Sequence, residues 1–368
     1  MRSSIIMRRF LFSTLLGALS AFAAGAQTIW PSPEIERVYT QGREALSQGD
    51  ARTALNLFRQ VADLAPDIPE ARRDLAQALV LTGDPEGALR ELEPLFRGRE
   101  ADASVYRIGV QAYTAQKKGD AALRLVREGI RRNPESGELF GAMGDMEAAT
   151  NRQEEALAAY LEGIERDPNY YLNYYKAANI YIFSKKLIWA ILYAETFLLY
   201  EHQTPRATDT RNLLFSAYRR FFFPNETDER MNPGSTRIQT GRASNFEDAV
   251  VQTLRRQAPV ISDGVTTENL IMLRARFLAE WSDAYARKYP YALFRYQDSM
   301  VRVGVFDAYN QQLLGRAEQG RGFEAWNKMN PKAIPEFAAW ATSHPFRAAL
   351  GEFYNNKRTK DVPYKRGN

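Results

Sequence analysis

Three prolines share one phase of a 34-residue period, and this spacing is the strongest constraint on what the chain can form. Pro134 lies 68 residues after Pro66, and Pro168 follows 34 residues later. Before each proline the sequence carries two helix-length amphipathic runs joined by a polar turn. Apolar residues at intervals of three and four place one stripe on each helix, and the proline ends the second helix because it lacks an N–H donor. One hairpin cannot bury both stripes alone, so the period predicts a stack of hairpins.

The stretch from 137 to 168 shows this layout most clearly. Phe140, Met143 and Gly144 form the stripe of its first helix, and Ala156 lies in the second. We expect Gly144 to let the two helices approach closely, with Ala156 packed beside it. The turns of the first four units are predicted at Gly49-Asp50, Gly83-Asp84, Lys117–Gly119 and Asn151-Arg152. A fifth unit covers about 171–201, and its second helix, 187–200, is apolar almost all round, which predicts burial on both sides.

The pattern resembles the tetratricopeptide repeat (TPR) family over about residues 35–204. The shared features are the period of 34, a small residue in the first helix, an alanine opening the second helix and the closing proline. The sequence departs from the family where Glu100 replaces the proline of the second unit, and it lacks the usual tryptophan near each unit's start. The resemblance implies a right-handed superhelix whose first helices line a concave groove that binds an extended peptide or a partner helix.

The family's groove positions can be carried onto this sequence residue by residue. They fall on Tyr39, Arg43, Arg73, Gln77, Arg107, Gln111, Tyr175, Lys176 and Asn179. Some family members hold a peptide's terminal carboxylate with paired lysines and asparagines, and Lys176 and Asn179 match part of that pattern. The corresponding residues of the neighbouring units differ, so we do not expect such a clamp. For any single position, a side chain that only faces solvent is more common than one that contacts a ligand directly.

Residues 1–26 have the features of a secretory signal peptide rather than of a folded segment. Arg2, Arg8 and Arg9 precede a short apolar run, and the small residues at 24–26 form a cleavage pattern that would leave Gln27 as the new terminus. The run is too short to span a membrane; an uncleaved amphipathic anchor is the alternative. The chain has no cysteine, so neither a lipoprotein anchor nor a disulfide is expected. These features predict secretion across the inner membrane, with the periplasm as destination and no transmembrane segment in the mature protein.

The second half predicts a different kind of helical structure. A helix over 208–222, capped by Thr208 or Asp209, would close the solenoid, which we place at 27–223. Phe221, Phe222 and Phe223 follow one another there, so at least one should be buried, with an exposed partner-binding patch as the alternative. Residues 224–244 read as a linker, 245–356 as an irregular α-helical domain and 357–368 as a basic tail. The expected helices in that domain are 246–257, 267–288, 291–314, a short piece that begins with 323–326, and 335–342. The fold class is therefore all-α.

Charge and aromatic content differ between the two halves. From Gln27 to Thr204 acidic residues exceed basic ones by 6, whereas from Pro205 to Asn368 basic residues exceed acidic ones by 8. The basic residues are scattered rather than arranged in a stripe, so no nucleic acid is expected as a partner. Phe277, Trp281 and Tyr285 recur every four residues, which is typical of a core-facing helix stripe.

No constellation of residues in the sequence indicates catalysis. The two histidines, His202 and His344, lack partners at ligand spacing, and there is no phosphate-binding loop or nucleophile elbow. We therefore expect no catalytic, cofactor-binding or metal-binding residue, and favour an exported scaffold or adaptor with a protein or peptide partner. Two alternatives stay open. One is a hydrolase acting on envelope polymers through C-terminal carboxylates such as Glu280 and Asp283, and the other is a carbohydrate-binding module built on the aromatic residues.

Overall fold

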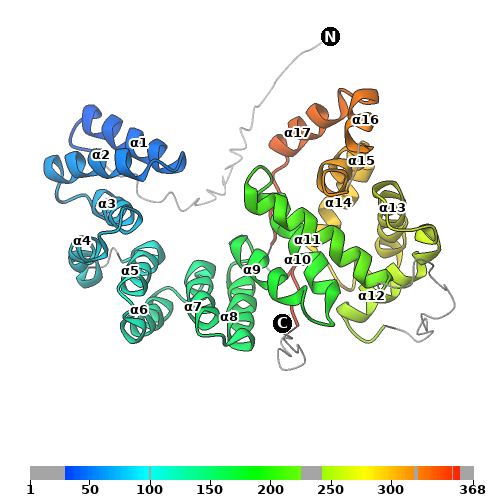
Figure 1. The fold of residues 1–368 in the computed structure, drawn as a ribbon, viewed down its shortest axis with the longest axis horizontal. Helices are drawn as coiled ribbons and strands as arrows, with labels where there is room; N and C mark the ends of the chain where they lie inside the picture. Colours follow the sequence, from blue (N-terminus) through cyan, green and yellow to red (C-terminus); the bar gives the residue numbers. More distant parts are fainter. Residues whose placement is uncertain (1–29, 99–100, 225–242, 319–321, 350, 357–368) are drawn as a thin grey trace, which may run out of the picture.

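The computed structural model describes residues 30–98, 101–224, 243–318, 322–349 and 351–356, and every regular element in these ranges is a helix (Figure 1). The all-α fold class is therefore confirmed. The expected signal peptide at 1–26, the basic tail at 357–368 and most of the expected linker lie outside the described residues.

The first ten helices form five hairpins, as the period predicts. Their bounds are α1 Pro33–Ser47, α2 Ala51–Leu64, α3 Pro69–Leu81, α4 Pro85–Arg97, α5 Ala103–Ala115, α6 Gly119–Arg132, α7 Gly137–Ala149, α8 Gln153–Arg166, α9 Leu172–Tyr181 and α10 Leu187–Tyr200. Figure 1 shows the first helix of each early hairpin, such as α3 and α5, along the inner side of an arc, with α4 and α6 outside. Successive first helices also contact one another, α1 with α3 and so on to α9.

The turns inside the first four hairpins repeat at the same 34-residue interval. Gly49, Gly83, Lys117 and Asn151 all have positive φ, between 59° and 89°. In each turn the N–H of the following residue donates to a carbonyl five positions earlier, at 2.8 to 2.9 Å. A residue in the left-handed conformation just past a helix end reverses the chain direction, so that the following N–H groups can donate to the last free carbonyls of the helix. The fifth hairpin turns differently: there the Ser184 hydroxyl accepts from the Lys186 N–H at 2.9 Å.

The packing of the fourth hairpin corrects two details of the sequence-based expectation. Leu139, rather than Phe140, is the fully buried residue of the α7 stripe. Gly144 does allow close approach, but the group beside it is the Tyr160 ring: a Cβ there would lie 2.8 Å from Tyr160 Cζ. A large ring against a glycine fills the same space as two small residues, so the spacing alone could not distinguish the two arrangements.

Helix α11, Pro205–Phe222, begins earlier than expected. Its N-cap is Thr204, whose hydroxyl accepts from the Ala207 N–H at 3.1 Å, so the predicted caps Thr208 and Asp209 are wrong. Proline suits the first helical position because its φ is preset and its missing donor is not needed there. At the other end Phe222 is buried, as expected for at least one of the three phenylalanines.

The C-terminal helices cover the expected regions with different boundaries. They are α12 Phe246–Arg256, a 3₁₀ turn Ala258–Ile261, α13 Thr267–Ala284, α14 Ala292–Val303, α15 Phe306–Asn310, a π-helical turn Gln311–Gly315, α16 Gly322–Met329 and α17 Ala333–Ser343. The single helix expected at 291–314 is wrong, because Gly304 takes a φ of 78° and ends α14. The α13 stripe is confirmed as core at Phe277 and Trp281, which are buried, whereas Tyr285 follows the end of the helix and is half-buried against the same core.

One hydrophobic core extends from the fourth hairpin into the C-terminal helices. It contains Ala156 of α8, the buried stretch Ile188–Leu198 of α10, and residues as distant as Ala348. The prediction that the helix at 187–200 is buried on both sides is therefore confirmed. A separate core cluster holds the first hairpins together, from Ile35 to Leu139. The division into a solenoid at 27–223 and a domain at 245–356 stays a prediction. Residues of both parts contribute to one hydrophobic core.

Candidate partner-binding face and junction pocket

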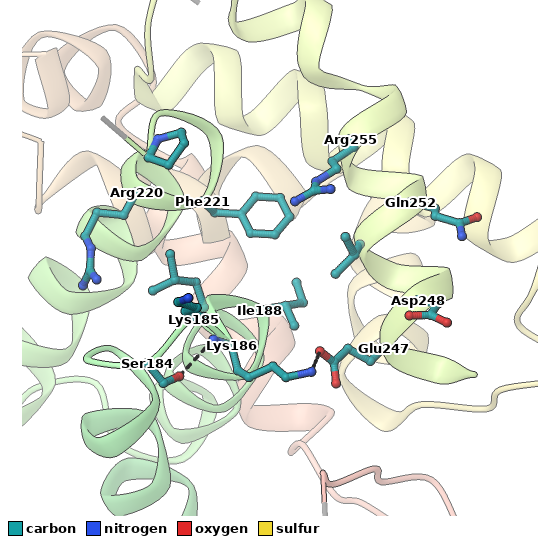
Figure 2. Close-up of a pocket in the computed structure, with 13 residues that line it drawn as sticks. Ser184, Lys185, Lys186, Ile188, Arg220, Phe221, Glu247, Asp248, Gln252 and Arg255 are labelled. Atoms are coloured by element: carbon teal, nitrogen blue, oxygen red, sulfur yellow. Dashed lines mark hydrogen bonds and ion pairs between the residues drawn. The ribbon is translucent and has the colours of Figure 1, made fainter. Parts of the chain in front are cut away.

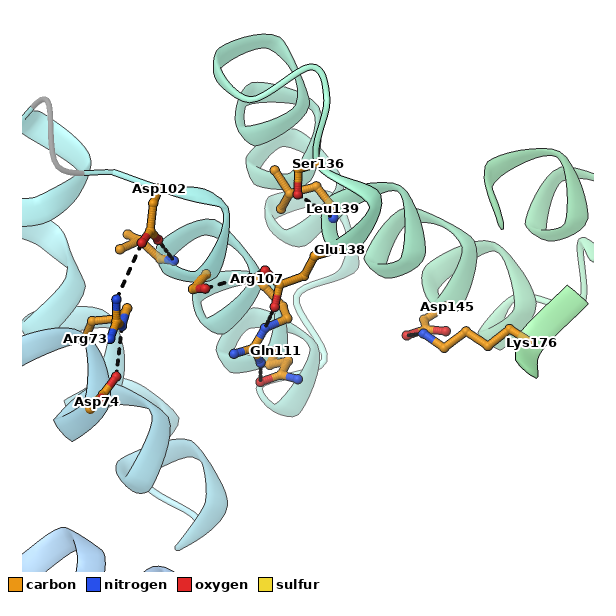
Figure 3. A network of polar contacts seen from close by, with 12 residues as sticks. Arg73, Asp74, Asp102, Arg107, Gln111, Ser136, Glu138, Leu139, Asp145 and Lys176 are labelled. Atoms are coloured by element: carbon orange, nitrogen blue, oxygen red, sulfur yellow. Dashed lines mark hydrogen bonds and ion pairs between the residues drawn. The ribbon is translucent and has the colours of Figure 1, made fainter. Parts of the chain in front are cut away.

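A series of polar contacts joins the first helices along the inner side of the repeats (Figure 3). At its start Tyr39 of α1 donates from its hydroxyl to Asp74 Oδ2 of α3 at 2.7 Å. Arg73 donates from Nε to Asp74 Oδ1 at 2.8 Å and from a terminal nitrogen to Asp102 Oδ2, at the start of α5, at 3.5 Å. The contacts of Tyr39 with Asp74 and of Arg73 with Asp102 each connect one repeat to the next.

The series continues through α5, α7 and α9. Arg107 donates to Glu138 Oε1 of α7 at 2.5 Å and to Gln111 Oε1 at 3.0 Å. Farther along, Lys176 of α9 donates to Asp145 Oδ2 of α7 at 2.6 Å. We call Arg73–Asp102, Arg107–Glu138 and Lys176–Asp145 the inter-repeat pairs. They place three of the four predicted groove cations opposite acidic groups of neighbouring units.

The cations of the inter-repeat pairs are half-buried, whereas two of their three carboxylate partners are exposed. The side chains of Arg107 and Glu138 are 23% and 22% exposed. Burial by itself lowers the pKa of Arg73, but the hydrogen bond and charge of Asp74 more than offset this, so its pKa lies above the ordinary range. The guanidinium is thus held charged and in place. Partly exposed ion pairs add little stability, so we interpret these pairs as links between successive first helices.

The other predicted groove residues differ in accessibility. Tyr39 is buried and packs against Trp30 with the rings tilted and their centroids 4.5 Å apart, so it supports the face rather than offering a free side chain. Arg43 and Gln111 are exposed, and Gln77 and Tyr175 are half-buried. Asn179 donates to the Tyr175 carbonyl at 2.8 Å. Direct contact of these residues with a partner stays a prediction.

Sequence reasoning missed the acidic half of the inter-repeat pairs. Asp145 falls in the same 34-residue series as Arg43, Gln77, Gln111 and Asn179, so the period contained the signal for it. Glu138 and Asp102 lie 31 and 29 residues from their partners. These offsets do not follow the period, and only the stacking of the hairpins brings the groups together.

A second candidate surface lies where the last hairpin meets α11 and α12 (Figure 2). The cavity there has a volume of about 560 Å³ and is lined by four cations and two carboxylates. Glu247 is held by Lys186 Nζ at 2.7 Å and Trp189 Nε1 at 3.0 Å. Figure 2 shows Arg255 extended toward Phe221, 5.7 Å from its ring, while Arg220 turns away. The charged groups therefore do not converge on one point of this cavity.

The two carboxylates named for a hydrolase differ in their surroundings. Glu280 accepts from Arg256 Nε at 2.6 Å and Gln257 Nε2 at 2.8 Å, and Asp283 is exposed. Within the described ranges no group of three or more histidine, aspartate or glutamate side chains is placed to hold a metal ion. In the same ranges no helix is both long and apolar enough to cross a membrane.

Comparison with known proteins agrees with this repeat geometry. Two family models described as "Tetratricopeptide repeat" match residues 45–108 and 109–171. Tetratricopeptide repeat protein 36 of Mus musculus is 36% identical over 101 residues, which cover 25% of this chain and 54% of that protein. The protein of the same name from Homo sapiens is 35% identical over 101 residues, 25% of this chain and 53% of that protein. The chain thus spans about half the length of these relatives.

Among solved structures, a thermophilic TPR protein from Thermus thermophilus aligns with 50% of this chain and 98% of its own, at 21% identity and a TM-score of 0.43. The crystal structure of MamA aligns with 43% of this chain and 92% of its own, at 21% identity and a TM-score of 0.33. The sequence matches and the 34-residue hairpins coincide over residues 45–171. Residues 45–171 therefore carry tetratricopeptide repeats.

Proposed function

We propose that the protein is an exported scaffold or adaptor of the cell envelope that holds another polypeptide against the inner face of its repeats. The observation that carries this proposal is the series of inter-repeat pairs, which together with the Tyr39–Asp74 hydrogen bond links five successive first helices. A surface whose side chains are already ordered loses less conformational entropy when a partner binds. This role requires no catalytic residue, cofactor or metal.

The charges on the inner face suggest how a partner would be recognised. Arg73, Arg107 and Lys176 are balanced by carboxylates of the protein itself. A partner would gain little by offering a carboxylate to them, because an existing ion pair would have to break first. Recognition would rest on shape and on hydrogen bonds to accessible groups such as Gln111 and Asn179. This recognition mode predicts an affinity that changes little with salt, since screening acts mainly on exposed charges.

Photo-cross-linking tests the inner face directly. We would place a photoreactive phenylalanine analogue at Gln111 on α5 and, as a matched control, at Arg127 on α6; both positions are exposed. After irradiation in cell-envelope extract, the Gln111 variant should yield a covalent adduct with a polypeptide that the Arg127 variant does not. Equal adducts from the two positions, or adducts from Arg127 alone, would contradict binding on the inner face.

Export rests on the sequence of residues 1–26 and has its own test. Cell fractionation followed by N-terminal sequencing should find the protein in the periplasm with Gln27 as its first residue. Replacing Arg8 and Arg9 with glutamate should retain the protein in the cytoplasm, because the basic start is a defining part of a signal peptide. A protein recovered in the cytoplasm with Met1 intact would contradict the export proposal while leaving the scaffold proposal standing.

A further inference from the structure

A smaller cavity lies between the end of the last repeat helix, α11 and the C-terminal helices α15 and α17. Its volume is about 270 Å³, slightly below the range of about 300–1,000 Å³ common for small-molecule sites. The apolar part of its wall comes from Leu198 of α10, Leu313 of the π-helical turn and Phe337 of α17. All three are buried. This wall suits a compact apolar group.

One charged side chain, Arg211 of α11, also forms this wall and is only 5% exposed. Its guanidinium donates to the His202 carbonyl and, at 3.5 Å, to the Thr208 hydroxyl. Both of these acceptors are neutral. Glu201, the acid next to His202 in the sequence, is already bound at 2.9 Å by both Nε and a terminal nitrogen of Arg206. In the part of the chain that the structure describes, no carboxylate forms an ion pair with Arg211.

The surroundings make this isolated charge unfavourable as it stands. Burial lowers the pKa of Arg211, and the positive charge of Arg316 lowers it further. A buried charge without a counter-ion is strongly disfavoured, and proteins normally pair it. An acidic ligand in the cavity that Arg211 lines would supply this counter-charge.

The wall contains a second unusual feature. Gln312 and Leu313 reach the cavity from the π-helical turn Gln311–Gly315. Such single turns are rare in helices and occur frequently at functional sites. Here the wider turn places a polar and an apolar side chain on the wall next to each other. His202, Gln203 and Thr342 add polar groups that are exposed at the rim.

We propose that this cavity binds an organic acid with an apolar body, its carboxylate paired with Arg211 and its body packed against Leu198, Leu313 and Phe337. A guanidinium forms short, charge-assisted hydrogen bonds with a carboxylate, and the apolar wall supplies the remaining affinity. The same chemistry is present in a short fatty acid and in the C-terminal carboxylate of a polypeptide ending in an apolar residue. The site is separate from the inner face of the repeats. This proposal therefore does not depend on the function proposed for the inner face.

Isothermal titration of the protein starting at Gln27 tests this site with octanoate, using octanamide as the neutral control of similar shape. Octanoate should bind saturably and at least tenfold tighter than octanamide. Arg211→Gln should weaken octanoate binding at least tenfold, whereas Arg219→Gln, which removes an exposed arginine from the same helix, should leave it unchanged. A pentapeptide ending in leucine, compared with its C-terminal amide, distinguishes the two sources: tighter binding of the free-acid peptide than of octanoate assigns the site to a polypeptide terminus.

A second variant protects the test against a folding defect in Arg211→Gln. Ala338 lies on the wall, is exposed, and has no polar side-chain group that could bond to Arg211. Ala338→Phe should fill the cavity and reduce octanoate binding at least tenfold while circular dichroism and the thermal midpoint stay unchanged. The proposal is overturned if octanoate fails to bind, if octanamide binds equally well, or if Ala338→Phe binds octanoate like the unmodified protein.

Discussion

Glu195 and Arg274 form an ion pair in the middle of the shared core. Glu195 lies on the second helix of the last hairpin and Arg274 on α13, and their side chains are only 2% and 4% exposed. Gln297 Nε2 and the Tyr309 hydroxyl donate to the same carboxylate oxygen of Glu195 at 2.6 and 2.7 Å. A single carboxylate therefore connects the repeats with three separate C-terminal helices.

Removing the charge of Glu195 should be strongly destabilising. Glu195→Gln leaves Arg274 charged and buried, and breaking one side of a buried pair costs about 3–5 kcal/mol. Urea unfolding followed by circular dichroism measures this loss. Glu162→Gln, which breaks an exposed pair with Arg166, is the control and should cost less than about 1 kcal/mol. Equal losses in the two variants would show that Glu195 does not connect the two parts.

The repeated turns allow a prediction in which one substitution weakens the fold and another strengthens it. Lys117 has a φ of 59°, which disfavours any residue with a Cβ, whereas Gly83 occupies the same place in the preceding hairpin. Lys117→Gly should raise the free energy of unfolding by up to about 1 kcal/mol, and Gly83→Ala should lower it by about 1–2 kcal/mol. Urea midpoints of the two variants provide the measurement. Shifts in the same direction would contradict the left-handed turn.

Close packing at Gly144 is testable with a single methyl group. The added Cβ of Gly144→Ala would overlap the Tyr160 ring, which cannot move freely because its hydroxyl donates to Asp145 Oδ1 at 2.9 Å. Overpacking of this kind costs about 1–3 kcal/mol. Gly119→Ala is the matched control, because nothing lies within 4 Å of its added Cβ. Equal thermal midpoints for the two variants would show that the interface at Gly144 can accommodate a methyl group.

Much of the repeat half could be predicted from the sequence because the residues that determine its helices and turns are close in sequence and recur periodically. Prolines, turn residues and apolar stripes recur every 34 residues, and each hairpin obeys the same packing rules. The boundaries that failed had local signals too: Thr204-Pro205 is a typical helix start, and Gly304 a typical helix end. At Gly304 the apolar pattern continued past the boundary and favoured a single longer helix.

The contacts of the candidate sites were beyond sequence reasoning for a different reason. Arg107 and Glu138 meet because of the rotation between successive hairpins, which the spacing of residues does not specify. Arg211 lacked any distinguishing motif, since only the folded core shows that an arginine at this place is buried without an acid. Such features depend on tertiary packing, so they appear only when the helices are placed.

The hydrogen bond from Tyr39 to Asp74 should make stability depend on alkaline pH. Burial and the neighbouring Asp74 raise the pKa of Tyr39 from 10.0 to about 12. The folded state therefore keeps the phenol neutral, and this contribution is complete below pH 10 and lost as the pH rises from 10 to 12. Tyr39→Phe cannot ionise. Urea midpoints should thus favour the unmodified protein at about pH 8, with a difference that shrinks toward about pH 11. A constant difference across this range would contradict the shift.

Exchanging the charges of Arg107 and Glu138 separates the structural role of an inter-repeat pair from a role in recognition. Arg107→Glu alone places two half-buried carboxylates together and should lower the free energy of unfolding by about 1–3 kcal/mol, whereas adding Glu138→Arg should restore most of it. Urea unfolding measures both. Recovery of the partner on an affinity column should follow stability, falling in the single variant and returning in the exchanged one. If the exchanged variant is as stable as the unmodified protein but recovers no partner, the partner contacts these charges directly. The proposal that the protein's own carboxylates satisfy the cations of the inner face would then be wrong.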